Sequence, residues 1–124
     1  KMKLVKFLVA ALVAVFAVGS LAGCSTSEAR AASEFAAVID VRTTDEWNSG
    51  HLQGAELIGI ADADFVEQIS QLDKTADYFI YCRSGNRAGQ AIDIMVDQGF
   101  TGELVNGGSV ANASKILGLD VVTN

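Results

Sequence analysis

The sequence predicts a single small α/β domain with a mostly parallel central sheet and helices on both faces. Two apolar runs, Ala36–Val41 and Tyr78–Tyr81, are rich in β-branched or aromatic residues, as is typical of strands buried on both sides. Segments with apolar residues at helical spacing alternate with strand-like runs, and this alternation favours parallel pairing. About 90 residues remain after the amino-terminal segment, enough for one domain and too few for two.

The elements follow one another in the order strand, helix, strand, helix. We expect strands over residues 36–41, 55–60, 78–82 and 103–105. We expect helices over residues 43–48, 62–72, 87–98 and 111–117. Thr43 or Thr44 can cap the first helix, and Gly50 ends it. Gly99 ends the third helix in the same way.

The stretch from Cys82 to Arg87 places a thiol between a strand-like run and a helical pattern. Cys82 is followed by Arg83, Ser84, Gly85, Asn86 and Arg87. Ligands of parallel sheets bind where strands end, and the N–H groups of such a loop, with the positive end of the helix, would favour a thiolate. We therefore predict an anion-binding catalytic loop. The alternative is a cysteine that is only a small buried apolar residue.

The amino-terminal segment has the parts of an export signal. Three lysines within the first six residues precede an apolar run of 12 residues, Phe7–Val18. A spanning helix needs ~20 apolar residues, so a signal peptide is favoured over a membrane span. Leu21-Ala22-Gly23-Cys24 resembles the lipobox of bacterial lipoproteins, in which cleavage leaves Cys24 as the lipid-bearing first residue. An ordinary secretory signal and an uncleaved anchor are the alternatives.

These features divide the chain into a signal peptide over residues 1–23, a tether over 24–33 and a folded domain over 34–124. Without the signal, six basic residues stand against 15 acidic ones, a formal charge of −9. Such an acidic chain does not favour binding to nucleic acid or to anionic lipid. We expect a monomer in the bacterial cell envelope, exported and lipid-anchored through Cys24 on the outer side of the cytoplasmic membrane or in the periplasm. With Cys24 lipidated, Cys82 has no partner for a disulfide.

Several short motifs carry a resemblance to a known family. They are Asp40-Val41-Arg42, Glu46-Trp47, Gly50-His51-Leu52, Gly54-Ala55, the loop from Cys82 to Arg87, and Gly107-Gly108. Their order and spacing resemble the rhodanese homology domain over about residues 36–110. The small size and the export signal are most similar to the single-domain periplasmic thiosulfate sulfurtransferases of the phage-shock type.

The resemblance implies a function and roles for particular residues. Cys82 would attack the outer sulfur of a donor such as thiosulfate, release sulfite and hold the sulfur as a persulfide until a thiol or cyanide accepts it. Residues 83–87 would bind the substrate. Asp40 and Arg42 would support the site by tying a strand to nearby loops, and His51 would support it without direct chemistry. No cofactor is implied, and one histidine with one free cysteine does not make a metal site.

Two other functions remain open from the sequence. A phosphatase or arsenate reductase is the first, but such enzymes have five residues between cysteine and arginine, whereas four separate Cys82 from Arg87. The tighter ring suits a sulfur atom better than a phosphate. The second is a persulfide carrier or redox partner without significant turnover of thiosulfate, which would use the same loop.

Overall fold

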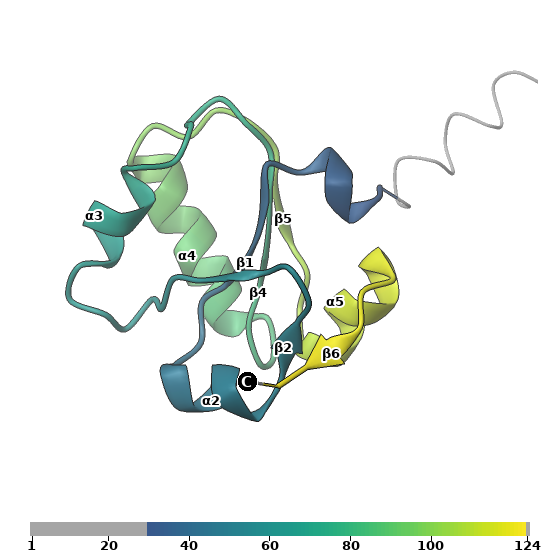
Figure 1. Cartoon of the computed structure of the whole chain (residues 1–124). Helices are drawn as coiled ribbons and strands as arrows, with labels where there is room; N and C mark the ends of the chain where they lie inside the picture. The colour runs from purple at the N-terminus through teal and green to yellow at the C-terminus, as the bar shows by residue number, and fades with distance from the viewer. Residues whose placement is uncertain (1–29, 124) are drawn as a thin grey trace, which may run out of the picture. The chain divides into compact units, whose positions relative to one another are not determined.

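The computed structural model describes residues 30–123, and its centre is a four-stranded parallel sheet (Figure 1). The strands lie in the order β3-β1-β4-β5, so the two most apolar strands occupy the middle. Their bounds are β1 (Ala37–Asp40), β3 (Glu56–Leu57), β4 (Tyr78–Tyr81) and β5 (Leu104–Asn106). All three pairings are parallel, with Val38 opposite Phe79 at the β1–β4 junction. The predicted α/β fold with a parallel sheet is confirmed.

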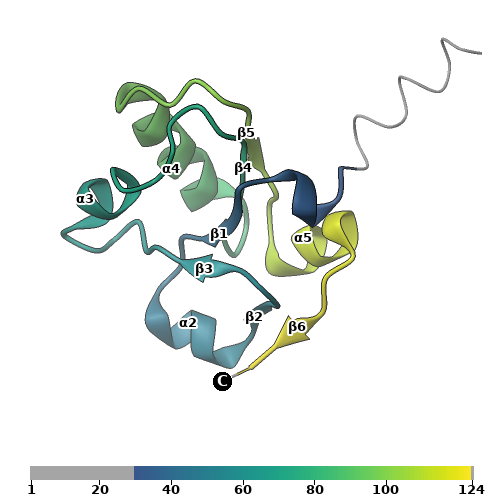
Figure 2. The same ribbon diagram turned by 45° about the horizontal axis from the view of Figure 1, so that its top comes forward.

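Helices lie on both sides of this sheet. Their bounds are α2 (Thr44–Ser49), α3 (Phe65–Ile69), α4 (Asn86–Asp97) and α5 (Val110–Leu117), with a short 3₁₀ helix η1 (Ala32–Glu34) before β1. Figures 1 and 2 show α3 and α4 on one side of the sheet and α5 on the other. Among the described residues, no helix is long and apolar enough to cross a membrane.

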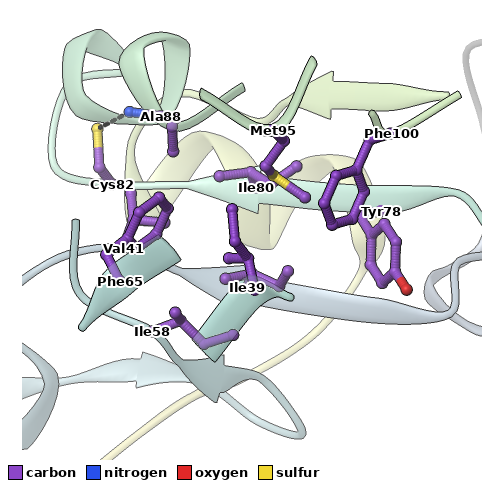
Figure 3. Close-up of a cluster of buried hydrophobic side chains, with 12 residues drawn as sticks. Ile39, Val41, Ile58, Phe65, Tyr78, Ile80, Cys82, Ala88, Met95 and Phe100 are labelled. Atoms are coloured by element: carbon purple, nitrogen blue, oxygen red, sulfur yellow. Dashed lines mark hydrogen bonds between the residues drawn. The ribbon is translucent and has the colours of Figure 1, made fainter. Parts of the chain in front are cut away.

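Side chains alternate between the two faces of the sheet along β4 and the residue after it. Tyr78, Ile80 and Cys82 belong to a buried cluster with side chains of α3 and α4, and Figure 3 shows this cluster. Phe79 and Tyr81 belong to a second cluster, on the side of α5. Successive side chains of a strand point to opposite faces, so this strand contributes to both cores. Each large side chain buried in this way stabilises the fold by roughly 1.5–3 kcal/mol.

The predicted helix ends are confirmed where caps mark them. Thr43, rather than Thr44, is the N-cap of α2, because its hydroxyl accepts from Glu46 N–H while the Glu46 carboxylate accepts from Thr43 N–H. Gly50 follows as the C-cap of α2. The third predicted helix ends at Asp97, and Gly99 has a positive φ of 98° that lets the chain turn away.

Two predicted elements are shorter than the sequence pattern indicates. The helix expected over residues 62–72 has only one helical segment, α3, because the chain before it turns at Asp62, whose N–H donates to Gly59 O. The strand expected over residues 55–60 pairs with β1 only at Glu56 and Leu57. Beyond that strand, single bonds from Ile58 and Ile60 to β1 and its end replace regular pairing.

A second, two-stranded antiparallel sheet was not predicted. It pairs β2 (His51–Leu52) with β6 (Val121–Val122). Two-residue strands are too short for alternation to distinguish them from loops. Figure 2 shows this small sheet beside α2, close to the end of the described chain. It therefore brings the carboxyl-terminal segment to the motif that contains His51.

Candidate active site

Cys82 lies directly after β4, at the end of the buried cluster and next to the first turn of α4 (Figure 3). Its side chain is fully buried. It is the free cysteine of the described residues. The predicted placement of the loop between the carboxyl end of a strand and the amino end of a helix is confirmed. The positive end of α4 therefore faces the sulfur.

Backbone N–H groups of the loop point at the Cys82 sulfur. Gly85 N–H donates to Sγ at 2.9 Å and Ala88 N–H at 3.4 Å. Burial opposes ionisation of the thiol, but the N–H groups of Ala88, Ser84, Gly85 and Arg87 outweigh it and lower the pKa of Cys82. Hydrogen bonds to the charged form stabilise that form. The loop is thus built to hold a thiolate.

A glycine pair after β5 is hydrogen-bonded to the end of β4 and to the cysteine that begins the loop. Gly107 N–H donates to Ile80 O at 2.7 Å, and Cys82 N–H donates to Gly108 O at 3.0 Å. A Cβ at Gly107 would overlap the ring of Phe79, so the close approach of the turn to β4 requires glycine there. The turn therefore fixes the backbone of the cysteine itself.

Arg87 is bound by a carboxylate from another part of the chain. Its Nη1 and Nη2 donate to the two oxygens of Glu46, on α2, at 2.8 and 2.9 Å. This bond lowers the pKa of Glu46 to about 2, and the same bond raises the pKa of Arg87. Both side chains are partly exposed, with 30% of Arg87 and 26% of Glu46 accessible. Arg87 is therefore a fixed cation at the end of the loop.

The three remaining predicted substrate-binding residues are exposed but differ in the hydrogen bonds that they make. Arg83 is exposed and, within residues 30–123, makes no hydrogen bond or ion pair. Ser84 is exposed and contributes its N–H to the ring around the sulfur. Asn86 is exposed, and its Oδ1 accepts from Gln90 Nε2 at 3.4 Å. Arg83 is thus the loop cation that remains available to a ligand.

Asp40 and Arg42, which the resemblance implied would tie a strand to nearby loops, form a buried ion pair. Arg42 Nη2 donates to Asp40 Oδ2 at 2.7 Å, and Arg42 Nε donates to both carboxylate oxygens. Arg42 Nη2 also donates to Gly50 O at 2.7 Å. The pair thereby joins the end of β1 to the segment between α2 and β2. Removing one partner would leave a buried charge without its counter-ion.

His51 is buried against α2. Its ring stacks on Trp47, with centroids 3.5 Å apart, and its Nδ1 lies 2.8 Å from Trp47 O. Its neighbour Leu52 donates its N–H to the hydroxyl of Tyr81 at 3.0 Å. Tyr81, the residue before Cys82, is thus hydrogen-bonded to β2. His51 packs β2 against α2 through its contacts with Trp47.

Two residues that contribute to the site were not predicted for these roles. Glu46 was noted only as part of a motif, and its bond to Arg87 joins positions 41 residues apart in sequence. Asn106, directly before the glycine pair, contacts the loop through its side-chain amide. Cys24 lies outside the described residues. Within the described range, no three His, Cys, Asp or Glu residues form a group that could hold a metal ion.

Comparisons with known proteins place these features in context. The family model of the rhodanese-like domain matches residues 25–114. MoeZ of Mycobacterium tuberculosis, a probable adenylyltransferase/sulfurtransferase, is 32% identical over 64% of the chain, and the chain spans only 21% of MoeZ. The thiosulfate sulfurtransferase PspE of Escherichia coli is 35% identical over 51% of the chain and 61% of PspE.

Solved structures agree with this match. The solution structure of protein HP1203 from Helicobacter pylori superposes with a TM-score of 0.62 at 32% identity, over 78% of this chain and 86% of that one. A rhodanese with anions from E. coli superposes with a TM-score of 0.56 at 27% identity, over 71% of this chain and 98% of that one. Both likenesses cover most of the residues that the structure describes.

Proposed function

Because the chain belongs to the rhodanese-like domain family, we propose that it is a sulfurtransferase that moves sulfane sulfur from thiosulfate, or a similar donor, to a thiol or cyanide. The observation that carries this proposal is the ring of N–H groups around the Cys82 sulfur. That ring favours the anionic sulfur needed for nucleophilic attack. The similarity to PspE, named as a thiosulfate sulfurtransferase, supports thiosulfate as donor.

In the first half of the reaction, the Cys82 thiolate attacks the outer sulfur of thiosulfate. A bond forms between Sγ and that sulfur, while the bond to the sulfonate sulfur breaks and its electron pair leaves with sulfite. Cys82 then carries a persulfide with one negative charge. The loop N–H groups that face the thiolate are suited to stabilise this charge as well, and no oxidant or reductant is needed.

In the second half, the acceptor attacks the terminal sulfur of the persulfide. Cyanide becomes thiocyanate, or a thiolate becomes a persulfide, and the electron pair of the broken sulfur–sulfur bond returns to Cys82. A reaction in these two halves, with a covalent intermediate between them, predicts ping-pong kinetics. Arg83 is the exposed loop cation and would meet an anionic donor first. A rhodanese from E. coli with a similar fold was solved with anions, which is consistent with an anionic donor for a domain of this fold.

The test is the Cys82→Ser variant, assayed for thiocyanate formation from thiosulfate and cyanide. We expect no transfer and an unchanged fold, with the mass of the wild-type Cys82 peptide increased by one sulfur atom after exposure to thiosulfate. A variant as active as the wild type would exclude Cys82 as the nucleophile. A wild type that takes up one sulfur atom but does not turn over would instead be a persulfide carrier.

We also propose that Cys24 bears a lipid that anchors the domain outside the cytoplasmic membrane of a bacterium. The support is the lysine-rich start, the short apolar run and the sequence Leu21-Ala22-Gly23-Cys24. A monomer is sufficient for the proposed chemistry, because the loop, its cations and the supporting glycine turn come from one chain.

A further inference from the structure

Asn106, the last residue of β5, joins the Cys82 loop to the glycine turn. Its Nδ2 donates to the carbonyl oxygen of Gly85 at 2.9 Å, and its Oδ1 accepts from Gly108 N–H at 2.9 Å. A carbonyl needs a donor and an N–H group needs an acceptor, so these two partners determine which end of the amide faces which group. One side chain thus satisfies a backbone group on each of two segments.

These bonds form a closed ring that begins and ends at Cys82. Cys82 N–H donates to Gly108 O at 3.0 Å, and Gly108 N–H is held by Asn106. Asn106 in turn holds Gly85, whose own N–H donates to the Cys82 sulfur at 2.9 Å. The backbone of the cysteine is therefore connected, through Asn106, to an N–H group that faces the cysteine's own sulfur.

Gly85 is a position where such support matters. It is the N-cap of α4 with a positive φ of 99°, and no side chain caps the helix there. Glycine has the greatest conformational freedom of any residue, so its N–H has no fixed direction without external contacts. The Gly85 carbonyl accepts from Gly89 N–H at 3.0 Å and from Asn106. A Cβ on Gly89 would lie 3.5 Å from Asn106 Nδ2, so the amide packs closely on the first turn of α4.

We propose that Asn106 is a positioning residue that holds Gly85, and with it the loop, in the conformation in which the loop N–H groups face the Cys82 sulfur. Asn106 acts through Gly85 and touches neither donor nor acceptor. The proposal builds on the proposed function, since it concerns the same sulfur, but its consequence for the thiol does not depend on any sulfur donor.

The test compares Asn106→Ala and Asn106→Leu with the wild type by the rate of alkylation with iodoacetamide as a function of pH. Leu keeps the branched shape of Asn, with a somewhat larger volume and no polar groups, so the pair of variants separates hydrogen bonding from packing. We expect both variants to raise the apparent pKa of Cys82 by roughly half a unit to one unit, as for the loss of about one hydrogen bond. Below the wild-type midpoint, alkylation should be roughly threefold to tenfold slower.

Asn112→Ala is the matched control. Asn112, in the first turn of α5, is also an exposed asparagine that holds the glycine turn, since its Nδ2 donates to Gly107 O at 2.9 Å, but within the described residues it makes no hydrogen bond to the loop from Cys82 to Arg87. Its alkylation profile should equal that of the wild type. The proposal is overturned if the Asn106 variants keep the wild-type profile, even with a lowered melting temperature, or if Asn112→Ala shifts the profile equally. A shifted profile in a protein that transfers no sulfur would contradict the proposed function and retain the positioning role.

Discussion

Replacing Arg87 by alanine should weaken the use of thiosulfate more than replacing Arg83 by alanine. The variant removes the fixed cation at the end of the loop and leaves the Glu46 carboxylate, formerly bound at 2.8 and 2.9 Å, without its guanidinium. Thr43 still donates to Glu46 at 3.1 Å, so the carboxylate stays near the loop. In the variant, an anionic donor is repelled by the Glu46 carboxylate, whose charge Arg87 neutralises in the wild type.

The size of the effect follows from the charge-assisted contact that we propose between Arg87 and the oxyanion of the donor. A hydrogen bond to a charged group contributes roughly 1.5–3 kcal/mol, which corresponds to a loss in kcat/KM of about tenfold to about a hundredfold. Because Arg87 and Glu46 are 30% and 26% accessible, solvent screening favours the lower end of that range. The measurement is kcat/KM for thiosulfate with cyanide as acceptor.

Two companion variants sharpen this test. Arg83→Ala removes an exposed cation that has no partner among residues 30–123; solvent screens this charge more strongly than that of Arg87, so the variant should have the smaller effect. The double variant Arg87→Ala with Glu46→Gln should recover part of the loss, because it removes the uncompensated carboxylate. Equal and small effects of Arg83→Ala and Arg87→Ala, or no recovery in the double variant, would refute the reasoning.

Three further predictions concern the Cys82 thiol, the ion pair of Glu46 with Arg87, and the amino-terminal segment. The alkylation rate of wild-type Cys82 should have its midpoint below the ~8.5 of a free cysteine, and a midpoint at or above this value would mean that the loop does not stabilise the thiolate. The pKa of Glu46 falls from 4.5 to about 2 on folding, so its ion pair stabilises the fold fully above the unfolded value and loses this contribution as the pH falls through about 2. Glu46→Gln should accordingly lower the melting temperature near neutral pH and converge with the wild type in strong acid; a constant difference at every pH would count against the pair. Cys24→Ala should block processing and lipid attachment, as read by mass spectrometry of the membrane fraction, whereas a normally processed variant and a lipid-free wild type would favour an ordinary secretory signal.

The central strands and the position of the Cys82 loop could be predicted from the sequence because both are local. The runs that form β1 and β4 are apolar on both faces, and the cysteine follows one of them directly. Local patterns of this kind need no knowledge of the rest of the chain.

The remaining parts depend on contacts between distant segments. The sequence shows Arg87 as a loop cation but does not show that Glu46, 41 positions earlier, binds it. Likewise, nothing local distinguishes Asn106 from a polar residue at the end of an edge strand, although an amide directly before two glycines is a signal worth testing in other chains. The sheet of β2 and β6 was missed for the related reason that its pairing joins residues far apart in sequence.

The alternation of side chains along β4 has a consequence for how this chain can change over evolutionary time. Cys82 shares a face with Tyr78 and Ile80, and the opposite face receives Phe79 and Tyr81. A deletion or insertion of one residue within the strand would exchange the two sets and direct the thiol toward the wrong core, whereas a change of two residues would preserve its side. Only even changes in the length of β4 are therefore compatible with keeping Cys82, the proposed nucleophile, on its present face of the sheet.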